Sequence, residues 1–445
     1  MLDRLEDLLR RARGQGAVEA DAFMVEEEIQ TIQVRMGEVE SLKHARETRC
    51  SLRIFTPTGS ASATSSDLSP AALARLIDET VTLARVTQRD EHSGLPGAES
   101  LARAVSELDL WDREGHQLPV EAKIERARRT EAAALEADPR IRNSEGAEFY
   151  DRQGEVAYAA TGGFGGRFRY SAFALSVTPV AADDGQMQRD YWYSSARKLA
   201  DLESPEAVGR EAARRTVRRL GARQQATAEV PVVFDPETAA SLVRALAHAA
   251  SGPSLYRGTS FLVGRLGERL APAGVTIVDD ALMVGGLGSR PFDGEGLPSR
   301  RTVLVDRGIL ASYLLDTYSA RKLGLRATGH AAREGGGGVT VGYTNLHLAP
   351  GPHPPDVILR SVDRGLYVTE LIGFGVNFVT GDYSRGAVGH WIENGELAHP
   401  VEEVTVAGNL RDMLGRIEMI GDDLVFRDQT AAPTLKISRM TVAGR

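Results

Sequence analysis

The 445 residues include a single cysteine, Cys50. One cysteine excludes an internal disulfide and a cysteine-rich zinc site. The sequence also has no apolar run of 18 residues, so we expect no membrane-spanning helix. The net charge of −8 argues against a general nucleic-acid binder, which would carry a basic balance. These absences predict a chain that works without membrane or nucleic acid.

The hydrophobic share of 42% and the charged share of 26% are typical of a globular protein, and the length suggests two or three domains. The first residues, Met1 to Leu9, form a charged amphipathic pattern with leucines at helical spacing. They lack the basic and then apolar order of a signal peptide. We therefore expect a cytoplasmic protein.

The first half of the sequence repeats one succession of elements. Helical periodicity at the N-terminus is followed by expected strands at about 21–30, 32–42, 48–56 and 59–65 and a helix at 70–86. After a connection, the expected elements are a helix at 119–137, strands near 140–147, 154–160, 167–179 and 186–195, and a helix near 204–220. This predicts an N-terminal α/β domain, residues 1–224, with two similar helix–strand lobes at about 1–90 and 118–222.

The second half begins with an expected strand at 230–234, after which Asp235 and Pro236 supply an N-cap and a first-turn proline for a helix of about 236–250. From residue 258 onward, short β-prone segments alternate with glycine turns, at 275–279, 302–306, 309–315, 339–347, 367–372, 388–394 and 401–407. That spacing predicts a β-rich, barrel-like domain at 225–445. The fold class expected for the whole chain is α+β.

The most specific pattern lies near the C-terminus, where glycines stand at positions 373, 375, 381, 386, 389 and 395. The segment 401–410 and the ending Ile437-Ser438-Arg439-Met440-Thr441-Val442-Ala443-Gly444 follow it. This ordered set resembles the C-terminal signature of the TldD/PmbA family. That family pairs a zinc-peptidase subunit, TldD, with a sister subunit called TldE or PmbA.

The resemblance makes one helix decisive. In the family's peptidase subunit this helix carries His-Glu-x-x-x-His, in which two imidazoles hold zinc and the glutamate takes a proton from the metal-bound water. A segment ending in Arg-Gly-Thr-Ser follows the helix, and residues 257–260 match it here. Counting back aligns the motif with Val243, Arg244 and His248.

Valine cannot bind zinc, and arginine stays protonated near pH 7 because its pKa is above about 12. The peptidase subunit also uses a C-terminal cysteine as a metal ligand, and no cysteine follows Cys50. The resemblance therefore implies no catalytic residue and no zinc in this chain. Without partners at motif spacing, His248 has a plainer interpretation, as a packed side chain or a partner of the helix C-terminus.

Six further residues are candidates for facing a peptide, a cavity or a partner. They are Tyr256, Arg257, Asp382, Tyr383, Ser384 and Arg385. The last four lie in an expected loop at 381–386, which is not Gly-x-Ser-x-Gly, so a nucleophilic Ser384 is not expected. The alternative is that Arg385 closes a tight corner by bonding nearby carbonyls.

His390, Glu393 and Glu396 could be mistaken for metal ligands. The intervening Asn394-Gly395 instead predicts a hairpin turn. Alternation along the strand would then place His390 and Glu393 on opposite faces.

The resemblance implies a TldE/PmbA-type, non-catalytic subunit of a heterodimeric zinc metalloprotease. Such enzymes act on small or unfolded peptides, as in peptide-antibiotic maturation or antitoxin degradation. The zinc would sit in a TldD-like sister chain, and this chain alone would form a homodimer. Two alternatives stay open: a stand-alone family member with non-proteolytic, peptide-modifying chemistry, and a pure interaction protein.

Overall fold

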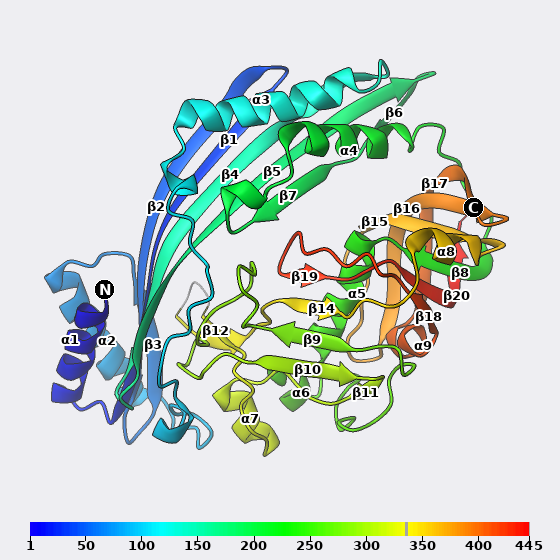
Figure 1. Ribbon diagram of the computed structural model, residues 1–445. Helices are drawn as coiled ribbons and strands as arrows, with labels where there is room; N and C mark the ends of the chain where they lie inside the picture. Colours follow the sequence, from blue (N-terminus) through cyan, green and yellow to red (C-terminus); the bar gives the residue numbers. More distant parts are fainter. Residues whose placement is uncertain (334–336, 445) are drawn as a thin grey trace.

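A long curved sheet arches over the C-terminal half of the chain in the computed structural model, which describes residues 1–333 and 337–444 (Figure 1). Its strands follow the order β3-β2-β1-β4-β5-β6, and β7 also pairs with β5. The strands are β1 (Glu19–Arg35), β2 (Glu38–Phe55), β3 (Ser60–Ser65), β4 (Ile141–Ala160), β5 (Gly165–Asp183), β6 (Gln186–Arg189) and β7 (Trp192–Ala196).

Two helix pairs cover opposite ends of one face of this sheet. α1 (Leu2–Gly14) and α2 (Pro70–Val86) enclose one apolar cluster, and α3 (Val120–Glu136) and α4 (Pro205–Val217) enclose another. The predicted recurrence of helix, strands and helix is confirmed, with three strands rather than four in the first half. The two lobes of the N-terminal domain share a single sheet because β1 pairs antiparallel with β4.

Four strand boundaries were predicted wrongly. The expected gap at 43–47 lies inside the single strand β2, and the segment expected at 186–195 is two strands, β6 and β7. The expected break near residue 31 does not exist, because β1 runs on to Arg35 and turns at Met36 and Gly37, both with positive φ. The segments expected at 140–147 and 154–160 are the two ends of the single strand β4. The polar residues between them belong to the ladder, where each residue pairs with one residue of β1 and one of β5.

Three helices begin with the same N-cap arrangement. Ser69, Ser204 and Asp235 each accept a hydrogen bond from a backbone N–H three residues later, at 3.3, 3.2 and 2.9 Å. A proline follows each of them at the first helical position, where its missing N–H costs nothing. The helix starts are therefore fixed by local sequence.

A five-stranded barrel forms the right-hand part of Figure 1, since β17 pairs with both β16 and β20. This confirms the barrel-like prediction. Its strands are β8 (Ala228–Phe234), β15 (Arg364–Ile372), β16 (Asp382–Glu393), β17 (Glu396–Asn409) and β20 (Leu435–Ala443), with β18 (Ile417–Ile420) added outside β20. The predicted turn at Asn394 and Gly395 is confirmed by their φ values of 51° and 78°.

A second sheet lies beside the barrel, in the order β11-β10-β9-β14-β19. Its strands are β9 (Ile277–Asp280), β10 (Arg301–Asp306), β11 (Ile309–Leu310), β14 (Leu346–Leu348) and β19 (Thr430–Ala431), and β12 (Ala331–Arg333) pairs separately with β13 (Val339–Val341). The strand predicted at 309–315 is therefore shorter than expected, and the one predicted at 339–347 is two strands.

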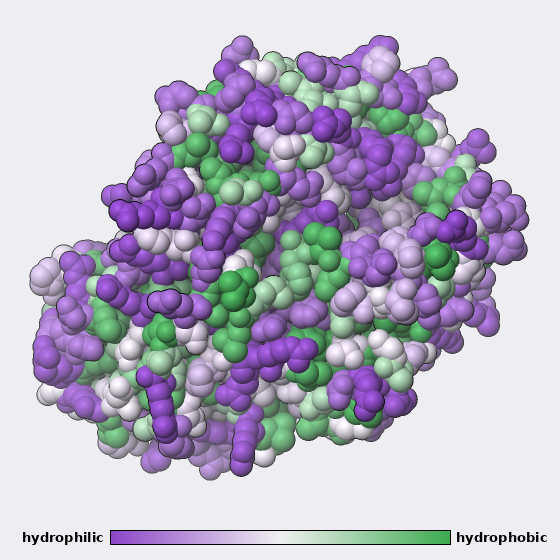
Figure 2. Space-filling model, viewed as in Figure 1, coloured by the Kyte–Doolittle hydropathy of each residue, from purple (hydrophilic) through white to green (hydrophobic). Residues whose placement is uncertain are grey.

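The shorter helices fill the connections. They are α5 (Pro236–Ala249), α6 (Gly252–Tyr256), α7 (Thr317–Leu323), α8 (Pro355–Arg360) and α9 (Leu410–Gly415), with single turns η1 (Ala98–Ser100), η2 (Gly115–Gln117) and η3 (Leu199–Asp201). α5 contributes to the largest apolar core, which joins the barrel to the second sheet. Within the described ranges, no helix has the length and apolar character needed to cross a bilayer. The surface in Figure 2 is mostly hydrophilic, with small apolar clusters.

Candidate functional site

Helix α5 carries the three motif positions on two different faces. Val243 points into the core, with 3% of its surface exposed. It lines a small apolar cavity of about 20 Å³ together with Leu242, Leu246 and Phe261. Arg244 is half-buried, and His248, four residues later, is exposed on the same side of the helix. The helix therefore presents one imidazole and one guanidinium, and the remaining position belongs to the core.

The imidazole of His248 lies against an aromatic ring. Its centroid is 4.2 Å from that of Phe378, which belongs to the segment between β15 and β16. Partial burial lowers the pKa of His248 below its ordinary value. The structure thus places His248 as a side chain packed on Phe378 at the last turn of α5.

These residues do not fit a zinc ion. A zinc site takes three or four nitrogen, sulfur or oxygen ligands at about 2.0–2.3 Å. Among residues 1–333 and 337–444, no group of three His, Cys, Asp or Glu side chains is arranged to hold a metal. A guanidinium at position 244 would also repel a divalent cation.

The segment expected as a loop at 381–386 is mostly the start of strand β16, so the expected loop is wrong. Alternation along this strand leaves Asp382 and Ser384 exposed and turns Tyr383 inward, where 2% of its surface is exposed. Burial raises the pKa of Tyr383 to about 12. Its hydroxyl group has no hydrogen-bond partner within the described ranges.

The charged groups of this segment find partners close by. The Asp382 carboxylate accepts a hydrogen bond from the Thr380 hydroxyl at 2.6 Å, which lowers the pKa of Asp382. Arg385 donates from Nη2 to the carbonyl of Leu371 at 3.1 Å. This contact favours the alternative in which Arg385 closes a corner of the barrel. Asp382 and Ser384 are exposed on the opposite face of the strand.

Tyr256 and Arg257 lie in a separate group at the end of α6. The Tyr256 ring meets the edge of Tyr318 at 5.6 Å between centroids, and the exposed Arg257 guanidinium lies 5.5 Å from the Tyr256 ring. Tyr318 in turn donates to Asp90 of the N-terminal half at 2.7 Å. The described contacts therefore tie Tyr256 to α7 and the N-terminal half, and tie His248 to the segment before β16.

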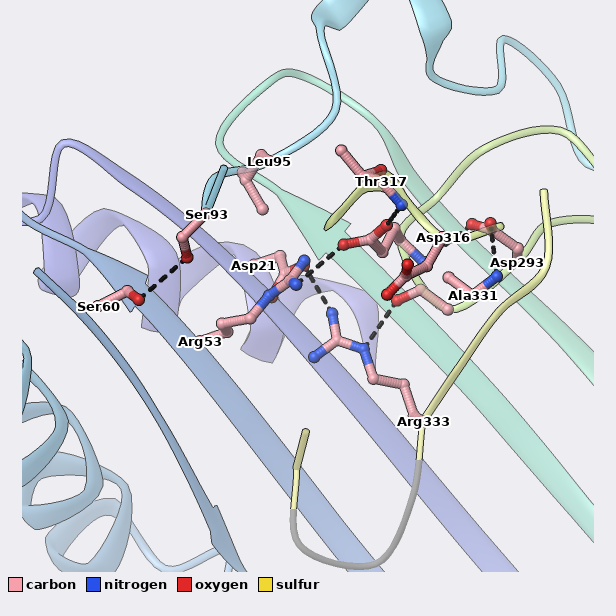
Figure 3. A network of polar contacts seen from close by, with 12 residues as sticks. Asp21, Arg53, Ser60, Ser93, Leu95, Asp293, Asp316, Thr317, Ala331 and Arg333 are labelled. Carbon is pink, nitrogen blue, oxygen red and sulfur yellow. Dashed lines mark hydrogen bonds and ion pairs between the residues drawn. The ribbon is translucent and has the colours of Figure 1, made fainter. Parts of the chain in front are cut away.

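A buried ion network joins the two halves of the chain, and sequence reasoning missed it (Figure 3). Asp21 of β1 is fully buried, and its Oδ2 lies 2.6 Å from Nη2 of Arg53 and 2.6 Å from Nη2 of Arg333. Arg53 also bonds Glu295 at 2.9 Å. Burial acts to raise the pKa of Asp21, but the guanidinium groups of Arg333 and Arg53 outweigh burial and lower it.

A second buried carboxyl group beside this network, that of Asp293, has a raised pKa. Asp293 accepts backbone N–H groups of Glu295 and Leu297, both at 2.9 Å, and of Ala331 at 3.1 Å. Burial, aided by the charge of Glu295, raises the pKa of Asp293 to about 6. Charged residues within apolar strands were the available signal, as in Ala20-Asp21-Ala22, because a charge on a buried strand needs a partner.

Comparison with known proteins gives consistent matches over most of the chain. Residues 20–84 match the profile of PmbA/TldA metallopeptidase domain 1, residues 113–220 that of the central domain, and residues 227–444 that of the C-terminal domain. The Metalloprotease PmbA of Escherichia coli O157:H7 is 39% identical over 415 residues, which cover 93% of this chain and 90% of that protein.

Two crystal structures share the fold over nearly their whole length. A Bacteroides thetaiotaomicron protein described as a candidate modulator of DNA gyrase superposes with a TM-score of 0.92 at 26% identity, covering 100% of this chain and 98% of its own. TldE from Thermococcus kodakarensis superposes with a TM-score of 0.90 at 21% identity, covering 99% and 100%. At that identity the second match concerns the fold alone.

Proposed function

Because this chain belongs to the PmbA/TldD family of metallopeptidases, we propose that it is the TldE (PmbA)-type subunit of a two-chain zinc peptidase and holds no zinc itself. The observation that carries the proposal is the state of helix α5. Val243 stands at the first ligand position and is buried among apolar side chains, and Arg244 stands at the position of the general base.

The same helix argues against a peptidase reaction within this chain. Hydrolysis by a zinc peptidase needs a metal to lower the pKa of water and a carboxylate to accept the proton. The guanidinium of Arg244 cannot accept one. His248 is left without a second ligand at motif spacing, and its ring is engaged by Phe378.

In this proposal the metal and the proton-accepting carboxylate come from a TldD-like sister chain with an intact His-Glu-x-x-x-His. The present chain contributes surface for a small or unfolded peptide. Its accessible candidates are Arg257, Asp382 and Ser384, and Tyr256 is half-buried. Tyr383 is buried, and Arg385 is half-buried with its guanidinium bonded to the carbonyl of Leu371. A homodimer of the chain alone, a heterodimer with the sister and a cytoplasmic setting belong to the same proposal.

Reconstitution with the sister chain tests this function. The purified chain alone is expected to leave unstructured peptides intact with or without added zinc, and the mixture with the sister is expected to cleave them. A sister whose motif glutamate is replaced by glutamine should abolish cleavage in the mixture, because the proton acceptor is lost. Zinc-dependent cleavage by the present chain alone would overturn the proposal.

A further inference from the structure

Strand β2 has a long outer edge that no other described strand covers. β3 pairs only with its last part, from Cys50 to Phe55, and the part from 38 to 49 pairs on its inner side with β1. In Figure 1, β2 rises beyond β3 along the arch. The backbone N–H and C=O groups of such an edge are a template for another strand.

Both faces of this stretch are bare as well as its edge. Residues 42–47 are six consecutive exposed residues, and successive side chains of a strand point to opposite faces. Apolar side chains are among the exposed groups of the same hairpin: Met36 is 52% exposed, Val39 38% and Leu42 49%. A strand open on its edge and on both faces is unusual within this sheet, whose other long strands are flanked on both sides.

Charges on edge strands commonly prevent association, so their order along β2 decides how the strand can pair. Two identical strands that pair antiparallel about a twofold axis must place residues of the same face opposite each other, so the axis passes through one residue. An axis at Lys43 opposes two lysines, one at Arg46 opposes two arginines and one at Glu47 opposes two glutamates. An axis at His44 brings no opposite charges together within 41–47. An axis at Leu42 opposes Glu38 to Arg46 and Glu40 to His44, but His44 and Arg46 already contact Glu28 of their own chain.

An axis at Ala45 gives a different result. It sets Lys43 of each strand opposite Glu47 of the other, on the same face as Ala45. On the second face it sets His44 opposite Arg46. Glu28 of the neighbouring strand offsets that pair, since its carboxylate lies 2.6 Å from His44 and 3.4 Å from Arg46. Opposite charges directly across a strand pair stabilise it.

We propose that β2 pairs antiparallel with β2 of a second copy of this chain, with the twofold axis at Ala45. The pairing joins two seven-stranded sheets into one continuous sheet across the dimer. This inference rests on the subunit pairing in the proposed function, and it adds the element and the register that make the contact. It does not depend on where zinc is bound.

Cysteine cross-linking tests the register. The native Cys50 is fully buried, so an introduced thiol is the reactive one. Opposite Cβ atoms of paired strands lie about 4.5–5.5 Å apart, within reach of a disulfide after a small movement. Ala45→Cys is expected to give a covalent dimer under mild oxidation. Lys43→Cys alone and Glu47→Cys alone are matched controls that stay monomeric on a denaturing gel, and a mixture of the two cross-links.

Charge exchange tests the same register without cysteine. Lys43→Glu should raise the concentration at which the dimer dissociates by about tenfold, since two attractive pairs become repulsive. Lys43→Glu combined with Glu47→Lys should restore dissociation close to that of the unaltered chain. The proposal is overturned if Ala45→Cys stays monomeric, if Lys43→Cys cross-links alone as well as Ala45→Cys does, or if the double exchange does not restore association. Cleavage by the chain mixed with its sister remains a separate readout, so the two proposals fail independently.

Discussion

Replacing Arg333 with methionine is expected to destabilise the chain by about 3–5 kcal/mol, the usual cost of removing one partner from a buried ion pair. The Arg333 side chain is 2% exposed and lies 2.6 Å from Asp21, which is fully buried. Its Nε also donates to the carbonyl of Gly294 at 2.7 Å. The substitution leaves the Asp21 charge in the interior with Arg53 as its remaining cationic partner. Urea unfolding followed by circular dichroism measures the loss.

Two further variants show how much of the destabilisation comes from the unpaired Asp21 carboxylate and how much from lost packing. Asp21→Asn combined with Arg333→Met should be less destabilised than Arg333→Met alone, because the buried carboxylate is then neutral. Arg326→Met is the matched control, since Arg326 is exposed on the surface, and it should shift stability by no more than about 0.5 kcal/mol. Equal losses in the single and double variants would show that the network contributes packing and no charge pairing.

Replacing His390 with glutamine is expected to reduce the loss of unfolding free energy that occurs as the pH falls from 7 to 4. His390 of β16 is 5% exposed, and its Nε2 lies 3.0 Å from the carbonyl of Arg218 at the end of α4. Burial, together with the charges of Arg218 and Arg219, lowers the pKa of His390 to about 4. Glutamine can keep the contact with the carbonyl through its amide N–H.

Because the pKa of His390 is lowered in the folded state, acidification destabilises the fold. An unfolded histidine titrates near 6.5, so the unfolded chain binds the proton first as pH falls from about 6.5 to 4. The folded state therefore loses stability over this window, by up to about 3 kcal/mol from His390 alone. Unfolding free energies measured at pH 7 and pH 4 should differ by that much less in His390→Gln. An identical fall in both proteins would contradict the burial of a neutral imidazole at this junction.

Local rules predicted the fold where a few neighbouring residues decide the structure. The helix starts at Ser69, Ser204 and Asp235 and the turn at Asn394-Gly395 were predicted because caps and turns depend on residues close in sequence. The continuity of β1 through residue 31 was missed because neighbouring strands decide where a strand ends. Thr31 pairs with Lys43 of β2 and with Tyr150 of β4, so the ladder runs on to Val34.

At the candidate site, the sequence predicted only which zinc ligands and catalytic groups are absent. Val243 and Arg244 could be identified from the aligned motif, since a change of residue type removes a ligand whatever the surroundings. The ring of Phe378 under His248 could not be predicted, because it arrives from a segment 130 residues away. The network of Asp21, Arg53 and Arg333 was missed for the same reason, since no local pattern joins strands so distant in sequence.

The most direct measurement of the central claim is the zinc content of the purified chain. We predict no stoichiometric zinc by elemental analysis after incubation with the metal and mild chelation, with the same result for His248→Ala. The physical reason is that Val243 offers no ligand, and Arg244 repels the ion. One zinc per chain that survives mild chelation and is lost in His248→Ala would contradict the account.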